Sequence, residues 1–113
     1  MVCLLCLACT QKFPELSNEI QVLVKYPGKY YFNMTSRDAT ADSVFRGAKT
    51  INIGNPDVFF IFIAREDRRR QPLAIEVVDA RMQRTIYRQA AAATNDTIHF
   101  TGSKKSGRWN FEY

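Results

Sequence analysis

Three cysteines and a single histidine are the side chains of this sequence best suited to bind a metal ion or to act as nucleophiles. Cys3, Cys6 and Cys9 all fall at the start of the chain, and His99 lies far downstream. A structural zinc site normally takes four ligands from two such clusters, and the sequence has no second cysteine pair. We therefore expect no metal ion, no other cofactor, and no disulfide beyond Cys9.

Catalysis needs a nucleophile, a base and a group that orients them, and the sequence offers few candidates. Alternation within residues 97–101 places His99 on the outward face of a strand, where a histidine is usually a surface residue. Glu76 and Asp79 are possible acid–base partners, whereas Glu66 and Asp67 belong to a charged segment, AREDRRRQP, that is typical of a hairpin loop. The motifs GxSxG and HExxH and a phosphate-binding glycine loop are missing. We therefore expect no enzymatic activity, and we identify no small-molecule substrate.

Basic residues dominate the second half of the chain: residues 58–113 hold ten Lys or Arg against six Asp or Glu. If the two densest clusters meet at one end of the fold, they form a rim that attracts lipid headgroups, lipopolysaccharide phosphates or an acidic protein. Nucleic-acid modules usually add exposed stacking aromatics, but here the aromatics occupy inward positions, so we expect no nucleic-acid partner. The alternative is that scattered arginines only keep the strand faces soluble. The clusters are Arg65, Arg68, Arg69 and Arg70, and Lys104, Lys105 and Arg108.

The N-terminal segment has the features of a processing signal. Residues 1–8, MVCLLCLA, are apolar but too short to span a membrane, which takes about 20 residues. They are typical of the end of a signal-peptide hydrophobic region with a small residue before the cleavage point. Leu7-Ala8-Cys9 resembles a bacterial lipobox, although Cys6 stands where leucine is usual and the positively charged start is missing. The resemblance implies that Cys9 carries a lipid anchor. The alternatives are a buried N-terminal strand or a palmitoylated cytosolic anchor.

Composition and alternation predict one all-β domain. The chain has 113 residues, 46% hydrophobic and 24% charged, which is ordinary for one folded domain. We assign residues 1–9 to the signal remnant, 10–18 to a linker and 19–113 to the domain. Short alternating segments separated by Gly, Pro, Asn and Asp predict a β-sandwich of seven or eight strands. These segments are residues 19–25, 29–35, 49–53, 58–64, 73–79, 84–89 and 97–101 and a terminal strand holding Trp109, Phe111 and Tyr113.

Residues 58–64, VFFIFIA, are apolar at every position, which predicts a central strand covered on both faces. Phe60, Ile61 and Phe62 are then expected to lie in the most buried strand of the fold. Trp109 is expected in the core because alternation places it on the same face of the terminal strand as Phe111 and Tyr113.

The turn at residues 26–29, YPGK, has type II chemistry, and tight pairing across it would set core residues opposite solvent-facing ones. The flanking strands should therefore turn a corner between sheets or meet through a bulge. Residues 88–94, RQAAAAT, are too few for a stable helix, so we interpret them as a loop or the frayed end of a strand.

The strand order, with INI, VFFIFIAR and LAIEVVDARMQRTIY in succession, resembles small bacterial envelope lipoproteins with an immunoglobulin-like sandwich. The last of these segments and SGRWNFEY are also similar to the closing strands of GOLD-type sandwiches, without their cysteine or transmembrane helix. These resemblances imply a fold and no particular activity.

The function we expect is a non-enzymatic domain on the periplasm-facing side of the bacterial cell envelope. It would be anchored in the membrane through Cys9 and would bind another envelope protein or an envelope component. One alternative is a secreted or lumenal binding module, which glycans on the sequons at Asn33 or Asn95 would support. The other is a structural subunit of a larger assembly.

Overall fold

The computed structural model describes residues 19–37, 39–68, 71–91 and 96–113. Within these ranges the chain forms nine β-strands and no helix, which confirms the all-β prediction with at least one strand more than expected. The strands are β2 (Ile20–Lys25), β3 (Lys29–Ser36), β4 (Thr40–Arg46), β5 (Lys49–Gly54), β6 (Val58–Arg65), β7 (Leu73–Asp79), β8 (Arg84–Ala91), β9 (Thr97–Lys105) and β10 (Arg108–Glu112).

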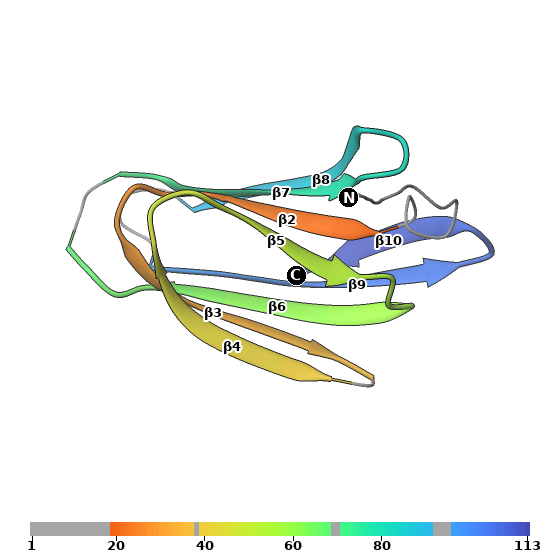
Figure 1. The fold of residues 1–113 in the computed structure, drawn as a ribbon, viewed down its shortest axis with the longest axis horizontal. Helices are drawn as coiled ribbons and strands as arrows, with labels where there is room; N and C mark the ends of the chain where they lie inside the picture. The colour runs from red at the N-terminus through yellow and green to blue at the C-terminus, as the bar shows by residue number, and fades with distance from the viewer. Residues whose placement is uncertain (1–18, 38, 69–70, 92–95) are drawn as a thin grey trace, which may run out of the picture.

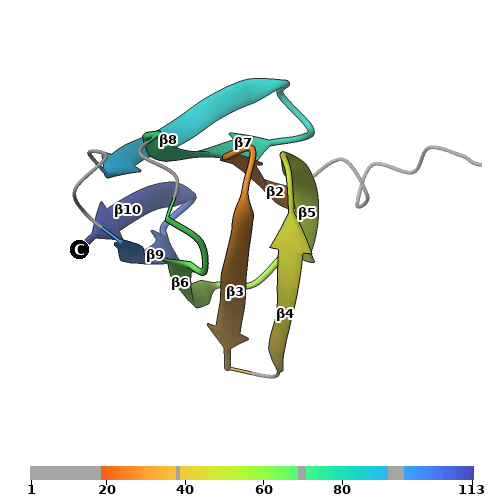
Figure 2. The ribbon, with the colours of Figure 1, turned by 90° about the vertical axis from the view of Figure 1, so that its left-hand side faces the viewer.

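The strands form two antiparallel sheets that pack as the two layers of a sandwich (Figures 1 and 2). One sheet has the order β10-β9-β6-β3-β4, and the other has the order β5-β2-β7-β8. β6 is therefore the central strand of the larger sheet, as predicted.

The corner predicted at residues 26–29 is confirmed, because β2 lies in the smaller sheet and β3 in the larger one. The corner is tied to the loop after β6. Asp67 accepts a hydrogen bond from the Tyr26 hydroxyl group and another, of 2.8 Å, from the backbone N–H of Lys29. Burial and the neighbouring Asp67 raise the pKa of Tyr26, which keeps its hydroxyl protonated as the donor. The corner is thus a hydrogen-bonded joint between the two sheets.

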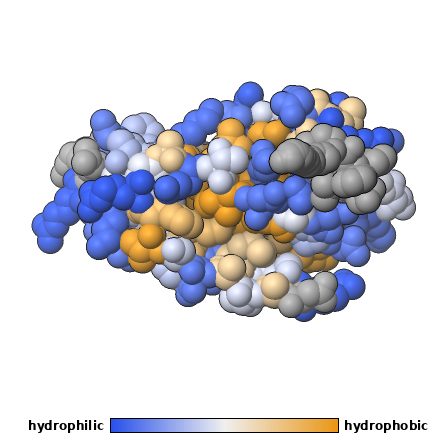
Figure 3. All heavy atoms as spheres, viewed as in Figure 1, coloured by the Kyte–Doolittle hydropathy of each residue, from blue (hydrophilic) through white to orange (hydrophobic). Residues whose placement is uncertain are grey.

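Alternate residues of the inner strands face each other and form the core, as strand geometry requires. In the view of Figure 3, hydrophobic side chains gather across the middle of the molecule and hydrophilic ones cover both ends. Fully buried members with large side chains are Ile20, Val22, Val24, Tyr26, Tyr30, Phe59, Ile61, Ile63, Leu73, Ile75, Ile98 and Phe100.

The prediction that β6 is covered on both faces is wrong. Phe59, Ile61 and Ile63 point inward and are fully buried, whereas Phe60 points outward and is 39% exposed. Phe62 shares the outward face and is only partly covered, with its ring 6.3 Å from that of Tyr31. The outward face stays uncovered by the described chain because each sheet packs on its partner through one face only.

The structure adds an unpredicted strand, places residues 88–91 at the end of a strand, which was one of the two expected alternatives, and leaves the terminal strand less buried than expected. β4, TADSVFR, was not predicted, because it is an edge strand with six of its seven residues exposed. Residues 88–91 are the end of β8, and the following residues 92–95 lie outside the described ranges. Trp109 is half-buried against the core rather than enclosed by it, and Tyr113 is 85% exposed beyond the last strand.

Tyr30 gives the fold a measurable sensitivity to alkali. Its ring is fully buried, its hydroxyl donates a 3.1 Å hydrogen bond to the Gly47 carbonyl, and burial raises its pKa to about 12 from an ordinary 10.0. The folded state therefore holds the phenolic proton more tightly than the unfolded chain, and this part of the stability is lost as pH rises from 10 to 12. We expect the titration of Tyr30 to lower the free energy of unfolding by about 2 kcal/mol between pH 10 and pH 12.

Urea denaturation of wild type and Tyr30→Phe between pH 8 and pH 12 measures this contribution. The substitution should flatten the alkaline limb relative to wild type. Parallel limbs in the two proteins would show that Tyr30 does not titrate abnormally.

Candidate anion-binding site

Two hairpins close one end of the sandwich and stand opposite each other. The β7–β8 turn is held by the Asp79 carboxylate, which accepts a 3.0 Å hydrogen bond from the backbone N–H of Arg81. The β9–β10 turn is a two-residue loop in which Ser106 and Gly107 both have positive φ, 53° and 77°. That pair of angles is the type I′ geometry, which matches the twist of antiparallel strands. Short, tight turns thus fix the two walls of the site.

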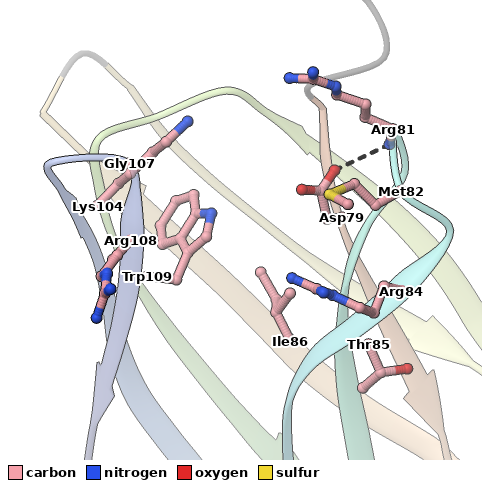
Figure 4. A pocket seen from close by; sticks show the side chains of 10 residues that line it. All are labelled: Asp79, Arg81, Met82, Arg84, Thr85, Ile86, Lys104, Gly107, Arg108 and Trp109. Atoms are coloured by element: carbon pink, nitrogen blue, oxygen red, sulfur yellow. Dashed lines mark hydrogen bonds between the residues drawn. The ribbon is translucent and has the colours of Figure 1, made fainter.

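A cavity of about 580 Å³ opens between these hairpins (Figure 4). Its size lies within the range of ordinary ligand pockets. The walls combine cationic, apolar and aromatic side chains from both hairpins. The lining residues are Asp79, Arg81, Met82, Arg84, Thr85, Ile86, Lys104, Gly107, Arg108 and Trp109.

The cavity is strongly cationic. It is lined by four basic side chains, those of Arg81, Arg84, Lys104 and Arg108, and by one carboxylate, Asp79. Across the described ranges, the structure gives Arg84, Lys104 and Arg108 no ion pair with an acidic residue. Their charges are therefore not neutralised within the described part of the protein, and they attract anions to this end.

Trp109 supplies a fixed aromatic wall. Its ring packs edge-on against Phe59 at 5.6 Å and stacks on Phe111 at 5.8 Å between ring centroids. Figure 4 shows the Trp109 indole between the hairpins and Ile86 on the facing wall. The Arg84 side chain extends from the β7–β8 hairpin toward the indole. The Lys104 ammonium lies 5.9 Å from the centre of the indole ring, within the range of a cation–π contact. A ligand would thus meet an apolar surface beside positive charge.

The structure does not bring the two predicted basic clusters together. β6 and β9 are antiparallel, with Val58 opposite Ser103 and Ala64 opposite Thr97. The loop that follows β6 and the hairpin that follows β9 therefore lie at opposite ends of the sandwich (Figure 1). The two basic clusters therefore do not form one continuous rim.

The predicted basic residues accordingly have different environments. Lys104 and Arg108 line the cavity, whereas Lys105 is exposed but does not line it. Arg68 is exposed at the opposite end. Arg69 and Arg70 lie outside the described residues, as does Cys9.

The Arg65 side chain is buried and interacts with other residues of the protein, so it is not accessible to a partner. Its side chain is only 2% exposed, its guanidinium lies 5.3 Å from the centre of the Tyr26 ring, and it donates a hydrogen bond to the Gln71 carbonyl. It also lies 3.8 Å from the Asp96 carboxylate. Arg65 therefore links the loops at its end of the sandwich.

Sequence reasoning missed Arg81 and Arg84, which complete the cavity. Both belong to the segment DARMQR at the β7–β8 turn, where isolated arginines look like ordinary solvated turn residues. The sequence does indicate two tight hairpins. It does not indicate that both lie at the same end of the sandwich, and the cavity forms only because they do.

The residues considered for catalysis do not form a common site. His99 is exposed on the outward face of β9. Glu76 is bound by Lys25 and by the Thr85 hydroxyl at 3.0 Å, and these contacts lower its pKa. Asp67 is part of the corner described above. Among residues 19–37, 39–68, 71–91 and 96–113, no group of three or more potential metal ligands occurs.

No family model, curated protein or solved structure matches this chain. In the part of the chain that the structure describes, no helix is both long and apolar enough to cross a membrane. The sequon residue Asn33 lies in β3 and accepts a 3.2 Å hydrogen bond from Thr35, whereas Asn95 lies outside the described residues.

Proposed function

We propose that this protein is a non-enzymatic binding module of the bacterial cell envelope, anchored in the membrane by a lipid on Cys9. Its immunoglobulin-like sandwich would hold an anionic group of another envelope protein or of an envelope component. The single observation that carries the binding proposal is the cationic cavity between the β7–β8 and β9–β10 hairpins.

The lining of the cavity defines the chemistry of the ligand. Arg84 and Lys104 can both donate hydrogen bonds to a phosphate or carboxylate, and charge-assisted bonds of this kind are among the stronger ones. Trp109 and Ile86 offer an apolar surface to the group that carries the anion. The ligand class is therefore an anionic group, a phosphate or a carboxylate, attached to an apolar or flat body.

Trp109 is the only tryptophan in the chain, so its fluorescence reports on the cavity directly. Inorganic pyrophosphate is a suitable probe for the anionic part of the ligand. We expect a saturable change in Trp109 emission that weakens at higher ionic strength, because salt screens the attraction. The double substitution Arg84→Gln/Lys104→Gln should weaken binding at least about a hundredfold, since each of the two lost charged contacts is worth roughly 1.5–3 kcal/mol.

Arg68→Gln is the matched control, because it removes one exposed arginine from the opposite end of the sandwich. It should leave the titration unchanged. Equal weakening by Arg68→Gln, or a change in emission that sodium chloride reproduces at the same ionic strength, would show that the effect is general screening and not a site.

The anchor is tested separately by labelled-palmitate incorporation into the protein expressed from its own gene. Cys9→Ala should abolish incorporation, because a lipid thioether needs that thiol. Cys6→Ala, three residues upstream, is the matched control and should keep the label. A wild-type protein without label that retains Met1 by mass spectrometry would contradict the anchor and favour the assembly-subunit alternative.

A further inference from the structure

β4 is an edge strand with one long free side. Within the described chain it pairs only with β3, over residues Thr40–Arg46 and without a register shift. The free backbone groups of such an edge form a template for pairing with another strand. Figure 2 shows β4 at the outer margin of its sheet, in the hairpin that it forms with β3.

The other edges carry more of the features that discourage strand pairing. β5 and β8 belong to pairs with a register shift, β2 with β5 and β7 with β8. β10 has only five residues. β8 also carries two arginines and β5 a lysine, whereas β4 carries one arginine, Arg46, and one aspartate, Asp42. β4 has no lysine, no proline and no shift, and it presents Val44, which is 49% exposed.

We propose that two copies of this chain associate through β4, in antiparallel register centred on Val44. Asp42, Val44 and Arg46 share the outward face of the sheet, since they alternate along the strand. Centred on Val44, the pairing sets each Val44 opposite its copy and each Asp42 opposite Arg46 of the second copy. The edge is thus complementary to itself in both charge and apolar surface.

Neighbouring registers lack this match. Centring the pair on Ser43 sets Asp42 opposite Val44, and centring it on Asp42 or on Arg46 brings two like charges together. The register on Val44 alone joins both opposite charges, and twofold symmetry provides that ion pair twice. In this register the Tyr31 and Val44 side chains of both copies form one row across the joint, because Tyr31 is the β3 partner of Val44.

The association is a closed dimer in which the two five-stranded sheets become one continuous sheet. The cavities are untouched, because they lie between the β7–β8 and β9–β10 hairpins and not at β4. This inference does not depend on the proposed binding function. An edge-to-edge joint buries less surface than a standard interface, so we expect a weak dimer.

Sedimentation velocity over a concentration series, in reducing buffer so that the cysteines stay as thiols, measures the dissociation constant. Asp42→Arg places two arginines opposite each other at both ends of the joint and should weaken the dimer at least about tenfold. The swap Asp42→Arg/Arg46→Asp restores opposite charges and should return the constant to within about threefold of wild type.

Glu112→Arg on the β10 edge changes the net charge as Asp42→Arg does and should leave the dimer intact. Thermal melts of each variant confirm that the fold is kept, because Asp42 also accepts a hydrogen bond from the Tyr31 hydroxyl. All variants share one N-terminal segment, so differences between them report on β4. A wild-type chain that stays monomeric at millimolar concentration would overturn the proposal. Association that Asp42→Arg leaves unchanged would overturn it as well.

Discussion

Phe59→Ala is expected to lower the free energy of unfolding by about 3–5 kcal/mol, the usual cost of removing a fully buried phenylalanine. The Phe59 ring is fully buried and lies edge-on to Phe100, Trp109 and Phe111, at 6.2, 5.6 and 6.3 Å between centroids. Its loss would remove the common contact of these three rings. The same substitution would also free Trp109 to move, since Phe59 supports the indole that lines the cavity.

Phe60→Ala is the matched control in the same strand. Its side chain points away from the core and is 39% exposed, so truncation should cost less than about 1 kcal/mol. Chemical denaturation of both variants provides the comparison. Equal losses would mean that both faces of β6 are covered, which is the arrangement that the apolar sequence VFFIFIA predicted and the fold does not have.

Gly102→Ala is expected to destabilise the protein by about 3 kcal/mol, because an added methyl group overpacks a filled space. Gly102 lies in β9 between Phe59 of β6 and Phe111 of β10, its partners on the two sides. A Cβ atom there would lie 2.6 Å from Phe59 Cζ and 2.8 Å from Phe111 Cε1. Both rings pack against other aromatics, so neither can retreat without loosening the cluster.

The substitution should broaden or shift the near-ultraviolet signal of Trp109 as well as lower the melting temperature. Gly54→Ala offers a useful contrast, because it meets no atom within 4 Å and is strained only by its positive φ of 80°. Gly102→Ala that leaves both the melting temperature and the Trp109 signal unchanged would contradict the packing described for β9.

The sequence predicted those strands in which burial alternates. In β2 and β7 one face is apolar and buried while the other is partly solvated, so a period of two identifies both the strand and its inward face. β6 is apolar on both faces, so its pattern placed it centrally but could not distinguish Phe59 from Phe60. Only pairing with β3 and β9 in one sheet decides which face meets the smaller sheet. β4 has almost no buried residue and therefore no pattern to detect.

The candidate site was only partly predictable for a different reason. Lys104 and Arg108 were visible as a basic cluster, but the loops that flank a cavity depend on strand direction. Local alternation does not contain that direction. The antiparallel pairing of β6 with β9 separates Arg68 from Lys104, and the β7–β8 hairpin brings Arg84 to the cavity instead. The composition of the site therefore depends on which strands pair over long sequence distances, and local residue patterns do not specify that pairing.

Chemical-shift mapping with inorganic pyrophosphate, in amide-detected spectra of the labelled protein, shows whether anions bind between the β7–β8 and β9–β10 hairpins. We expect saturable shifts of the Trp109 indole N–H and of the backbone amides of residues 81–86 and 104–109, the segments of the two hairpins that contain most of the lining residues. The amides of residues 65–68, at the other end of the sandwich, should stay in place. Shifts confined to residues 65–68, or small shifts spread evenly over all exposed basic residues, would contradict an anion-binding cavity between the β7–β8 and β9–β10 hairpins.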